Sequence, residues 1–222
     1  LATVCDVMPL TGFNRALVAQ GLKVMGRRGR AGIAALLEVT GARDAPSAHT
    51  LGFLLGPRIN ASGRIGEPDL GLRLLLCEDA VEARAIAEKL DAVNRRRQEV
   101  EGEMLAAAHA MAEAQADQGR AVLLLVGEGW HPGVVGIVAG RMKERFNRPA
   151  CVAGLGDGLA KGSGRSVPGV DLGAAVIAAR QAGLLETGGG HAMAAGFSFR
   201  AGREEEVHAF LEDRLKHAAL LP

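Results

Sequence analysis

"DAVEARAIAEKLDAVNRRRQEVEGEMLAAAHAMAEAQADQ", residues 79–118, contains no proline and a single glycine, Gly102. Asp79 with Glu82 fits a capping box, a pairing that satisfies backbone N–H groups at the start of a helix. Apolar residues then follow a heptad pattern that one arginine interrupts: Ile86, Leu90, Val93, Arg97, Val100 and Met104. The stretch predicts one helix of about 40 residues, roughly 60 Å long. Because an interior glycine costs helix stability, two helices that break near Gly102 are the alternative.

The residues before this stretch are mostly helical by pattern. Apolar positions recur at helical spacing over 14–25 and 30–39, a third helix begins at Ser47 as its cap, and 70–77 is a short apolar helix. Residues 56–69, GPRINASGRIGEPD, are rich in Gly, Pro, Asn and Ser, which predicts a loop.

After the long helix, the pattern changes to strands that alternate with helices. The expected strands are 121–126, 149–154, 158–167 and 194–199. The expected helices are 133–146, 171–183 with Asp171 as its cap, and 203–218. This alternation predicts an α/β lobe. The fold class is therefore α/β, organised as a mostly helical segment 1–77, a connecting helix 78–118 and a second lobe 119–222.

Composition excludes several classes of protein. Of the 222 residues 48% are hydrophobic, and no apolar run approaches the ~18 residues of a membrane span, so we expect a soluble protein without a membrane partner. A net charge of +1 and 3% aromatic residues argue against a global basic field and a base-stacking platform. Three separated cysteines without a CxxC pair argue against zinc and disulfides and favour a cytoplasmic location. Because Leu1 lies within an apolar stretch, we expect a piece of a longer protein.

The segment SGRS, residues 163–166, is the first candidate for anion binding. Ser163 and Arg165 are two positions apart, so in an extended segment both point to one face. A guanidinium fork beside a hydroxyl suits phosphate oxygens, and the adjoining glycines leave space for a ligand. We include Ser166 in this candidate set. A solvated loop is the alternative.

A second glycine-rich turn, GEGWHPG at 127–133, lies between an expected strand and an expected helix. It fits a dinucleotide loop only weakly, because its third glycine comes one position late and no acidic residue follows at the required distance. A tight turn that allows close packing is the alternative.

The loop predicted at 56–69 carries the cationic pair Arg58 and Arg64, with Asn60 between them. We consider these three residues candidates for substrate binding. The alternative is that Arg58 caps a helix and Arg64 is merely exposed. The cluster Arg27, Arg28 and Arg30 is more typical of a solvated face.

Three glycines, Gly188, Gly189 and Gly190, precede His191. They suggest that a ligand must approach the backbone closely at the imidazole. An imidazole beside exposed backbone N–H groups can bind a phosphate or stabilise charge developing on it. A metal-binding role is less supported, because no second ligand stands at a suitable spacing.

Asp6 follows an apolar run, residues 1–5, that resembles a strand. A carboxylate at the carboxyl end of a strand is where α/β folds place metals and substrates. One carboxylate is a single ligand, and a hard-metal site usually needs several.

Taken together, five stretches are similar to the bacterial RecJ exonucleases, which belong to the DHH phosphoesterases. They occur in this order: ATVCDVMPLTGFNR, LGPRINASGRIG, WHPGVVGIVAGR, SGRSVPGVDL and GGGHAMAAGF. The resemblance runs from residue 1 to about 199. It implies a catalytic lobe with two divalent metal ions, Mn²⁺ or Mg²⁺, a connecting helix, and a DHH-associated lobe that holds single-stranded DNA. It also implies 5′–3′ degradation to mononucleotides in DNA repair and recombination.

The resemblance also assigns roles to single residues. It implies that Asp6 is a metal ligand and that Ser163 and Arg165 grip the terminal 5′ phosphate. It implies that His191 faces the scissile phosphate and that Arg58 and Arg64 line the substrate cleft. We therefore take His191 and Arg58 as candidate catalytic residues.

The sequence departs from the family in one respect, because it contains no Asp-His-His triplet. We therefore expect the chain by itself to be inactive, and expect a monomer whose partners include single-stranded DNA, a single-strand-binding protein and a helicase. Two other functions stay open. One is a DHH phosphoesterase acting on short oligonucleotides or cyclic dinucleotides, and the other is a non-enzymatic nucleic-acid-binding or coiled-coil module.

Overall fold

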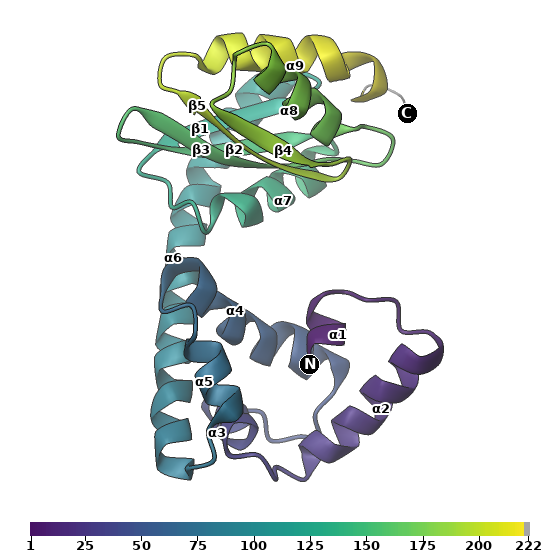
Figure 1. The fold of residues 1–222 in the computed structure, drawn as a ribbon, viewed down its shortest axis with the longest axis vertical. Coiled ribbons are helices and arrows are strands. Elements are labelled where there is room, and N and C mark those ends of the chain that lie inside the picture. Colours follow the sequence, from purple (N-terminus) through teal and green to yellow (C-terminus); the bar gives the residue numbers. More distant parts are fainter. Residues whose placement is uncertain (220–222) are drawn as a thin grey trace. The chain divides into compact units, whose positions relative to one another are not determined.

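The structure, a computed structural model, describes residues 1–219, with side chains to residue 216. It divides into two compact units, residues 1–98 and residues 99 onward, and the boundary falls inside helix α6 (Ala80–Asp117; Figure 1). Helix α6 is continuous, so the expected single helix is confirmed and the break near Gly102 is wrong. A Cβ at Gly102 would meet no atom within 4 Å. The Asp79 carboxylate accepts a hydrogen bond from the Glu82 N–H at 2.7 Å, as the capping pattern predicts.

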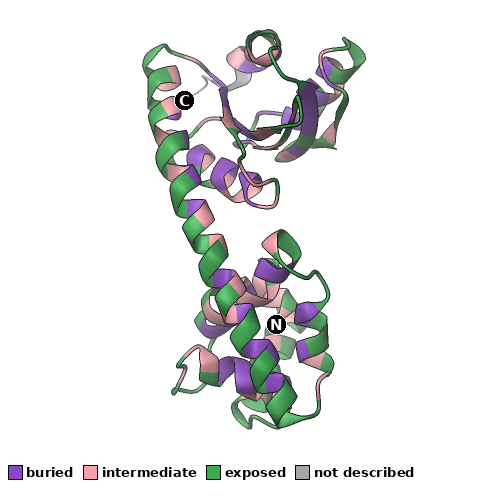
Figure 2. Ribbon diagram, turned by 90° about the vertical axis from the view of Figure 1, so that its left-hand side faces the viewer, coloured by how far each residue is buried: buried purple, intermediate pink, exposed green. Residues whose placement is uncertain are grey.

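Unit 1 is helical. It contains α1 (Ala2–Cys5), α2 (Gly12–Gly26), α3 (Ala31–Val39), the π-helix η1 (Thr50–Leu55), α4 (Gly56–Ile65), α5 (Leu70–Leu76) and the first part of α6. Figure 2 shows buried segments on several of these helices, and their core is rich in leucine: Leu36, Leu37, Leu55, Leu70, Leu74 and Leu90. The heptad positions Ile86 and Leu90 are buried in this same core. The first part of the α6 seam therefore packs within unit 1 and is not available for a coiled coil.

Two segments of unit 1 differ from the sequence-based predictions. Residues 1–5 were predicted as strand-like, but Ala2–Cys5 forms α1, and the first ten residues of the predicted loop 56–69 form α4. Pro57 lies in the first turn of α4, directly after η1, where the hydrogen-bond spacing changes from the π-helical to the α-helical pattern. Close packing explains the rest, since a Cβ at Gly71 of α5 would lie 2.9 Å from Ile59 Cγ2 of α4. Tertiary burial thus overrides the weak helix propensity of the Gly, Asn and Ser residues.

Unit 2 is built on a five-stranded sheet with the order β1-β2-β3-β5-β4. The strands are β1 (Leu123–Glu128), β2 (Ala150–Gly156), β3 (Leu159–Arg165), β4 (Thr187–His191) and β5 (Ala194–Arg200). Strands β1 and β2 are parallel, and the other neighbouring pairs are antiparallel. Helix α7 (Val135–Phe146) covers one face, while α8 (Leu172–Gln181) and α9 (Glu204–Ala219) cover the other (Figure 1). The expected α/β class is confirmed.

Both faces of the sheet are packed against helices. Val122 and Leu124 pack with α8 and α9, and by strand alternation Leu123 and Leu125 point to the other face. Cys151 is fully enclosed in the α8–α9 side, and burial raises the pKa of its thiol to about 12. The thiol is therefore neutral and acts as an apolar core group. Within residues 1–219, no helix is long and apolar enough to cross a membrane.

Strand β1 forms one edge of the sheet, and a side chain of α6 protects it. The side-chain amide of Gln115 donates to the Leu124 carbonyl at 2.7 Å and accepts from the Leu124 N–H at 3.0 Å. This pairing replaces part of the hydrogen bonding that another strand would supply and blocks edge-to-edge association there.

Candidate functional site

The strand register places Arg165 and His191 on the same face of the sheet. Ala194 of β5 is directly opposite Arg165 of β3 on one side and His191 of β4 on the other. Directly opposed residues in antiparallel strands project to one face. With about 4.8 Å between neighbouring strands, the two backbones lie roughly 10 Å apart. Only the methyl group of Ala194 stands between the two side chains along this row.

The next row of the same face holds Ser163. Its Oγ accepts a hydrogen bond from an Arg165 terminal nitrogen, Nη1, at 2.7 Å, and that nitrogen also donates to the Gly164 carbonyl at 2.9 Å. These contacts fix the guanidinium, while the Ser163 hydroxyl keeps its own proton for another acceptor. The expected extended segment, with Ser163 and Arg165 on one face, is confirmed.

The first turn of α7 approaches this pair. A Cβ at Gly136 would lie 3.1 Å from Arg165 Nη2 and 3.3 Å from Ser163 Oγ, so the glycine permits the close approach. No side chain caps the N-terminus of this 12-residue helix. The partial positive charge of a helix N-terminus, a guanidinium and a hydroxyl are together well suited to a phosphate group.

Gly136 was not predicted as part of this site. The nearest signal in the sequence was the strand-to-helix turn GEGWHPG, which fits a dinucleotide loop only weakly. The turn does lead from β1 into α7, but the site uses a later glycine, inside the helix. Only the approach of α7 to β3 shows this, and that approach is a tertiary contact.

The three glycines before His191 form β4 rather than a bare turn, and they serve different purposes. Gly190 has φ +156°, and a Cβ there would lie 2.3 Å from the Ala194 carbonyl oxygen. A Cβ at Gly188 would lie 3.0 Å from Val176 Cγ1, on the α8 side. A Cβ at Gly189 would meet nothing within 4 Å. Internal packing thus explains two of the glycines, and only Gly189 leaves open space.

His191 is the last residue of β4, and its side chain is exposed. Its Nδ1 accepts a hydrogen bond from the Met193 N–H at 3.3 Å, which in the neutral ring places the proton on Nε2. Gly173 of α8 packs against the backbone of His191, because a Cβ at Gly173 would lie 2.8 Å from the His191 carbonyl carbon. The histidine is therefore held by its backbone and presents Nε2 as a donor.

Ser166, which was predicted to contact substrate, has a different environment. Only 1% of the residue is exposed, and its hydroxyl donates to the Val170 carbonyl at 2.7 Å. The side chain is directed into the core because it follows the strand alternation one position after Arg165. This environment gives no support to a direct substrate contact through the Ser166 hydroxyl.

The candidates of unit 1 lie on α4. Asn60 and Arg64 are four positions apart, so they share one face of the helix. Arg58 lies on another side, where its Nε donates to Asp91 Oδ1 at 2.8 Å and its Nη1 to the Leu54 carbonyl at 2.7 Å. With only 17% of its side chain exposed, Arg58 also fixes α4 to α6.

Asp6 follows α1 and is exposed. Within residues 1–219, no group of three or more His, Cys, Asp and Glu side chains is placed to hold a metal ion. The strand that was expected to present this carboxylate is a short helix. Asp6 is thus an isolated candidate ligand.

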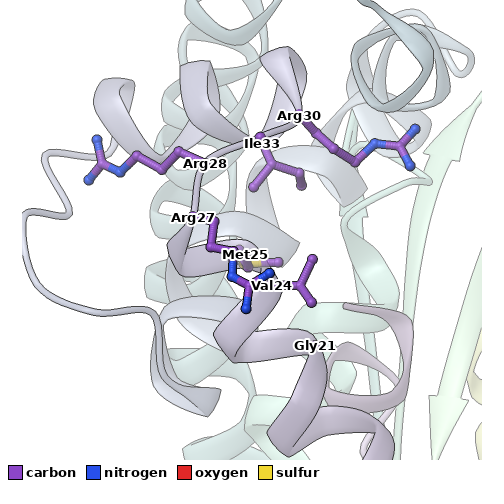
Figure 3. A pocket seen from close by; sticks show the side chains of 8 residues that line it. Gly21, Val24, Met25, Arg27, Arg28, Arg30 and Ile33 are labelled. Carbon is purple, nitrogen blue, oxygen red and sulfur yellow. The ribbon is translucent and has the colours of Figure 1, made fainter.

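A further hollow of about 250 Å³ lies where α2 leads into α3. Val24, Met25 and Ile33 contribute apolar surface, and three arginines stand around it: Arg27, Arg28 and Arg30. The arginine side chains diverge, with Arg28 and Arg30 pointing in opposite directions (Figure 3). Arg28 donates to the Ala42 carbonyl at 3.0 Å. This arrangement does not concentrate positive charge on one point.

Comparisons with known proteins agree with this fold. Residues 118–217 match the DHHA1 domain, which places unit 2 in that domain class. The chain is 47% identical over 223 residues to the single-stranded-DNA-specific exonuclease RecJ of Dickeya dadantii, covering 96% of this chain and 38% of the relative. It is 45% identical over 223 residues to the Escherichia coli RecJ, with the same two shares.

A solved structure gives the same result. The crystal structure of RecJ in complex with Mn²⁺ from Thermus thermophilus matches with a TM-score of 0.84 and 37% identity, over 99% of this chain and 32% of that one. The chain is thus similar to RecJ exonucleases over nearly its whole length, and it spans 38% of the length of the two curated relatives above.

Proposed function

We propose that this chain is the substrate-binding part of a metal-dependent 5′–3′ exonuclease that acts on single-stranded DNA. The observation that carries the proposal is that Ser163, Arg165 and the N-terminus of α7 come together on one face of the sheet. His191 lies on the same face, in the same row as Arg165. The names of the relatives, single-stranded-DNA-specific exonuclease RecJ, support this choice of substrate.

The geometry suggests a role for each group. Arg165, Ser163 and the Gly136 amide at the start of α7 would bind the terminal 5′ phosphate, because they supply charge-assisted and neutral donors together, while the neighbouring Val135 and Ile137 amides donate to backbone carbonyls. His191 would donate from Nε2 to a non-bridging oxygen of the next phosphate, whose bond to the terminal nucleotide is cleaved. Its hydrogen bond would stabilise charge that develops on that phosphate. The roughly 10 Å between the two backbones leaves room for one nucleotide between the two contacts.

The metal ions must be considered separately. The matching RecJ crystal structures contain Mn²⁺ or Mg²⁺, and such ions activate water and stabilise the leaving oxygen in phosphodiester hydrolysis. The described residues of this chain do not fit a two-metal centre, because no three or more of their His, Cys, Asp and Glu side chains are grouped to hold an ion. We keep Asp6 as one ligand of a centre in the full-length enzyme, and expect the 222-residue chain to bind substrate without hydrolysing it.

The phosphodiesterase alternative receives less support from this site. A cyclic dinucleotide has no terminal phosphate, so it would leave the Ser163–Arg165 contacts without their natural ligand. A short oligonucleotide would satisfy them only when it carries a 5′ phosphate.

The remaining proposals rest on the family resemblance. They comprise a role in DNA repair and recombination, a cytoplasmic location, and partners that include a single-strand-binding protein and a helicase. We also propose that Asn60, Arg64 and Arg58 contribute to DNA binding through α4, and that the chain is a monomer.

Replacing Arg165 in the full-length parent enzyme tests the proposed function. Arg165→Ala should lower the preference for a 5′-phosphorylated over a 5′-hydroxyl single strand, measured as the ratio of the two kcat/KM values. Loss of hydrogen bonds to a charged group costs about 1.5–3 kcal/mol, so the ratio should fall about ten- to a hundredfold.

Arg200→Ala is the matched control, because Arg200 lies on the same sheet and pairs with Glu186 at 2.7 Å. It should leave the ratio unchanged. If the Arg165→Ala enzyme retains the wild-type preference, the terminal phosphate does not bind at this site.

A further inference from the structure

The loop between β3 and α8, residues 166–171, begins directly after Arg165 and contains a tight turn. The Val170 N–H donates to the Val167 carbonyl at 3.2 Å, and Gly169 between them has φ +87°. Proline followed by glycine is the pattern of a type II turn, because proline sets the first φ and glycine accepts the positive second one. Both valines are buried, so the loop is packed onto the core of unit 2.

This loop also holds the two-residue turn that follows His191. The Ser166 N–H donates to the Met193 carbonyl at 3.0 Å. At the other end of the loop, the Leu172 N–H donates to the Ala192 carbonyl at 3.1 Å. A segment that starts at the proposed phosphate-binding arginine therefore fixes the backbone next to the imidazole.

The Ser166 hydroxyl closes the loop from the inside. It donates to the Val170 carbonyl at 2.7 Å, and only 1% of the residue is exposed. Because this bond joins the first and fifth residues of the loop, it fixes the shape of the loop and the direction of the Ser166 N–H. A buried carbonyl without a donor is costly, so loss of the hydroxyl favours a rearrangement of the loop.

Met193 connects the loop to the imidazole. Its carbonyl accepts from the Ser166 N–H, while its own N–H donates to His191 Nδ1 at 3.3 Å. In a neutral ring this second bond keeps the proton on Nε2. Displacement of Met193 would release Nδ1 and allow the proton to occupy either nitrogen. Ser166 is thus linked to the imidazole through one intervening residue.

We propose that Ser166 is a positioning residue for His191. Its hydroxyl holds the 166–171 loop in the form that fixes the turn at Ala192 and Met193. The imidazole then presents its Nε2 proton to the phosphate that is cleaved. The inference rests on the proposed function, because it requires His191 to donate to that phosphate. It also gives Ser166 a role that needs no contact with substrate.

The imidazole of the 222-residue chain provides the first test. With ¹⁵N-labelled histidine, the two ring nitrogen shifts of His191 report which nitrogen carries the proton. Their loss in His191→Ala assigns them among the six histidines. At about pH 8, where a free imidazole is neutral, the wild-type chain should hold the proton on Nε2. In Ser166→Ala the two shifts should move towards each other, because both tautomers are then populated.

Ser62→Ala is the matched control. Ser62 lies in unit 1, only 1% of it is exposed, and its hydroxyl donates to the Ile59 carbonyl at 2.8 Å. The substitution removes a buried hydroxyl of the same kind but should leave both His191 shifts unchanged. Fluorescence of the single tryptophan, Trp130, reports whether unit 2 of each variant is folded. If Ser166→Ala does not fold, Ser166→Cys takes its place, and its weak thiol donor should give a smaller movement of the shifts in the same direction.

The full-length parent enzyme provides the second test. Ser166→Ala should lower kcat on a 5′-phosphorylated single strand about tenfold, because small misplacements of a group that stabilises developing charge reduce the rate steeply. KM and the preference for a 5′ phosphate should stay at their wild-type values, because Arg165 keeps its contacts with the Ser163 hydroxyl and the Gly164 carbonyl. A purely structural role would lower stability without this separation of kcat from KM.

A folded Ser166 variant with wild-type His191 shifts overturns the inference, and so does a parent variant with the wild-type kcat. Loss of the 5′-phosphate preference also contradicts it, because Ser166 would then act on Arg165. None of these results affects the proposed binding of the terminal phosphate, which Arg165→Ala tests by itself. Changed shifts together with a lower kcat and an unchanged preference support the inference.

Discussion

Single residues of the site were predicted with uneven success, and the reason is physical. The two-residue spacing of Ser163 and Arg165 is local, so it predicted their shared face correctly. The closeness of Arg165 to His191 was not predictable from the sequence, because it depends on β5 lying between β3 and β4. Ser166 was assigned to substrate, but it follows the last residue of β3 and is buried.

His191 should affect catalysis more than stability. Because its side chain is exposed, His191→Ala in the parent enzyme should lower kcat about a hundredfold through lost charge stabilisation. The free energy of unfolding of the 222-residue chain should change by less than about 0.5 kcal/mol.

His208→Ala provides the contrast, since His208 is buried and its Nε2 lies 2.7 Å from the Val122 carbonyl oxygen. That variant should lose stability. A His191→Ala enzyme with the wild-type kcat would make the glycine–histidine strand a structural feature only.

Among the elements, long periodic segments were predicted well and short glycine-rich ones poorly. Helix α6 and the capping residues Asp79 and Asp171 were found as expected. Strand β4 was missed because three of its five residues are glycine, which has low strand propensity. Its formation depends on pairing with β5, and that information is not local to the segment.

One contact between α9 and the start of β1 should contribute measurably to the stability of unit 2. The Glu212 carboxylate of α9 accepts hydrogen bonds from the Ala121 and Val122 N–H groups at 2.8 and 3.0 Å, where the chain enters β1. Glu212→Ala leaves two buried donors without a partner, so the free energy of unfolding should fall by about 2–4 kcal/mol. Denaturation of the 222-residue chain in urea, followed by Trp130 fluorescence, measures this.

Glu205→Ala is the control on the same helix. Glu205 is exposed and pairs with Arg120 at 2.9 Å, and surface pairs contribute about 0–1 kcal/mol. Similar small effects from both substitutions would show that the α9 carboxylate does not hold the start of β1.

For the whole molecule, the change from helical patterns to alternating strands and helices near residue 120 predicted the α/β class. The sequence could not indicate that the two compact units divide within α6, at residues 98 and 99, because helical periodicity continues through that point. The metal centre was also beyond local reasoning. The sequence offers Asp6 as one candidate ligand, and the described residues contain no group of three or more metal-binding side chains.

The central claim is that Ser163, Arg165 and the start of α7 bind a terminal phosphate. Titration of the ¹⁵N-labelled 222-residue chain with 5′-dTMP, followed by NMR, tests it most directly. The account predicts saturable shifts of the Gly136 amide and the Arg165 Nε signals, which thymidine without phosphate does not reproduce. Absence of these shifts with 5′-dTMP, or equal shifts with thymidine, would contradict it.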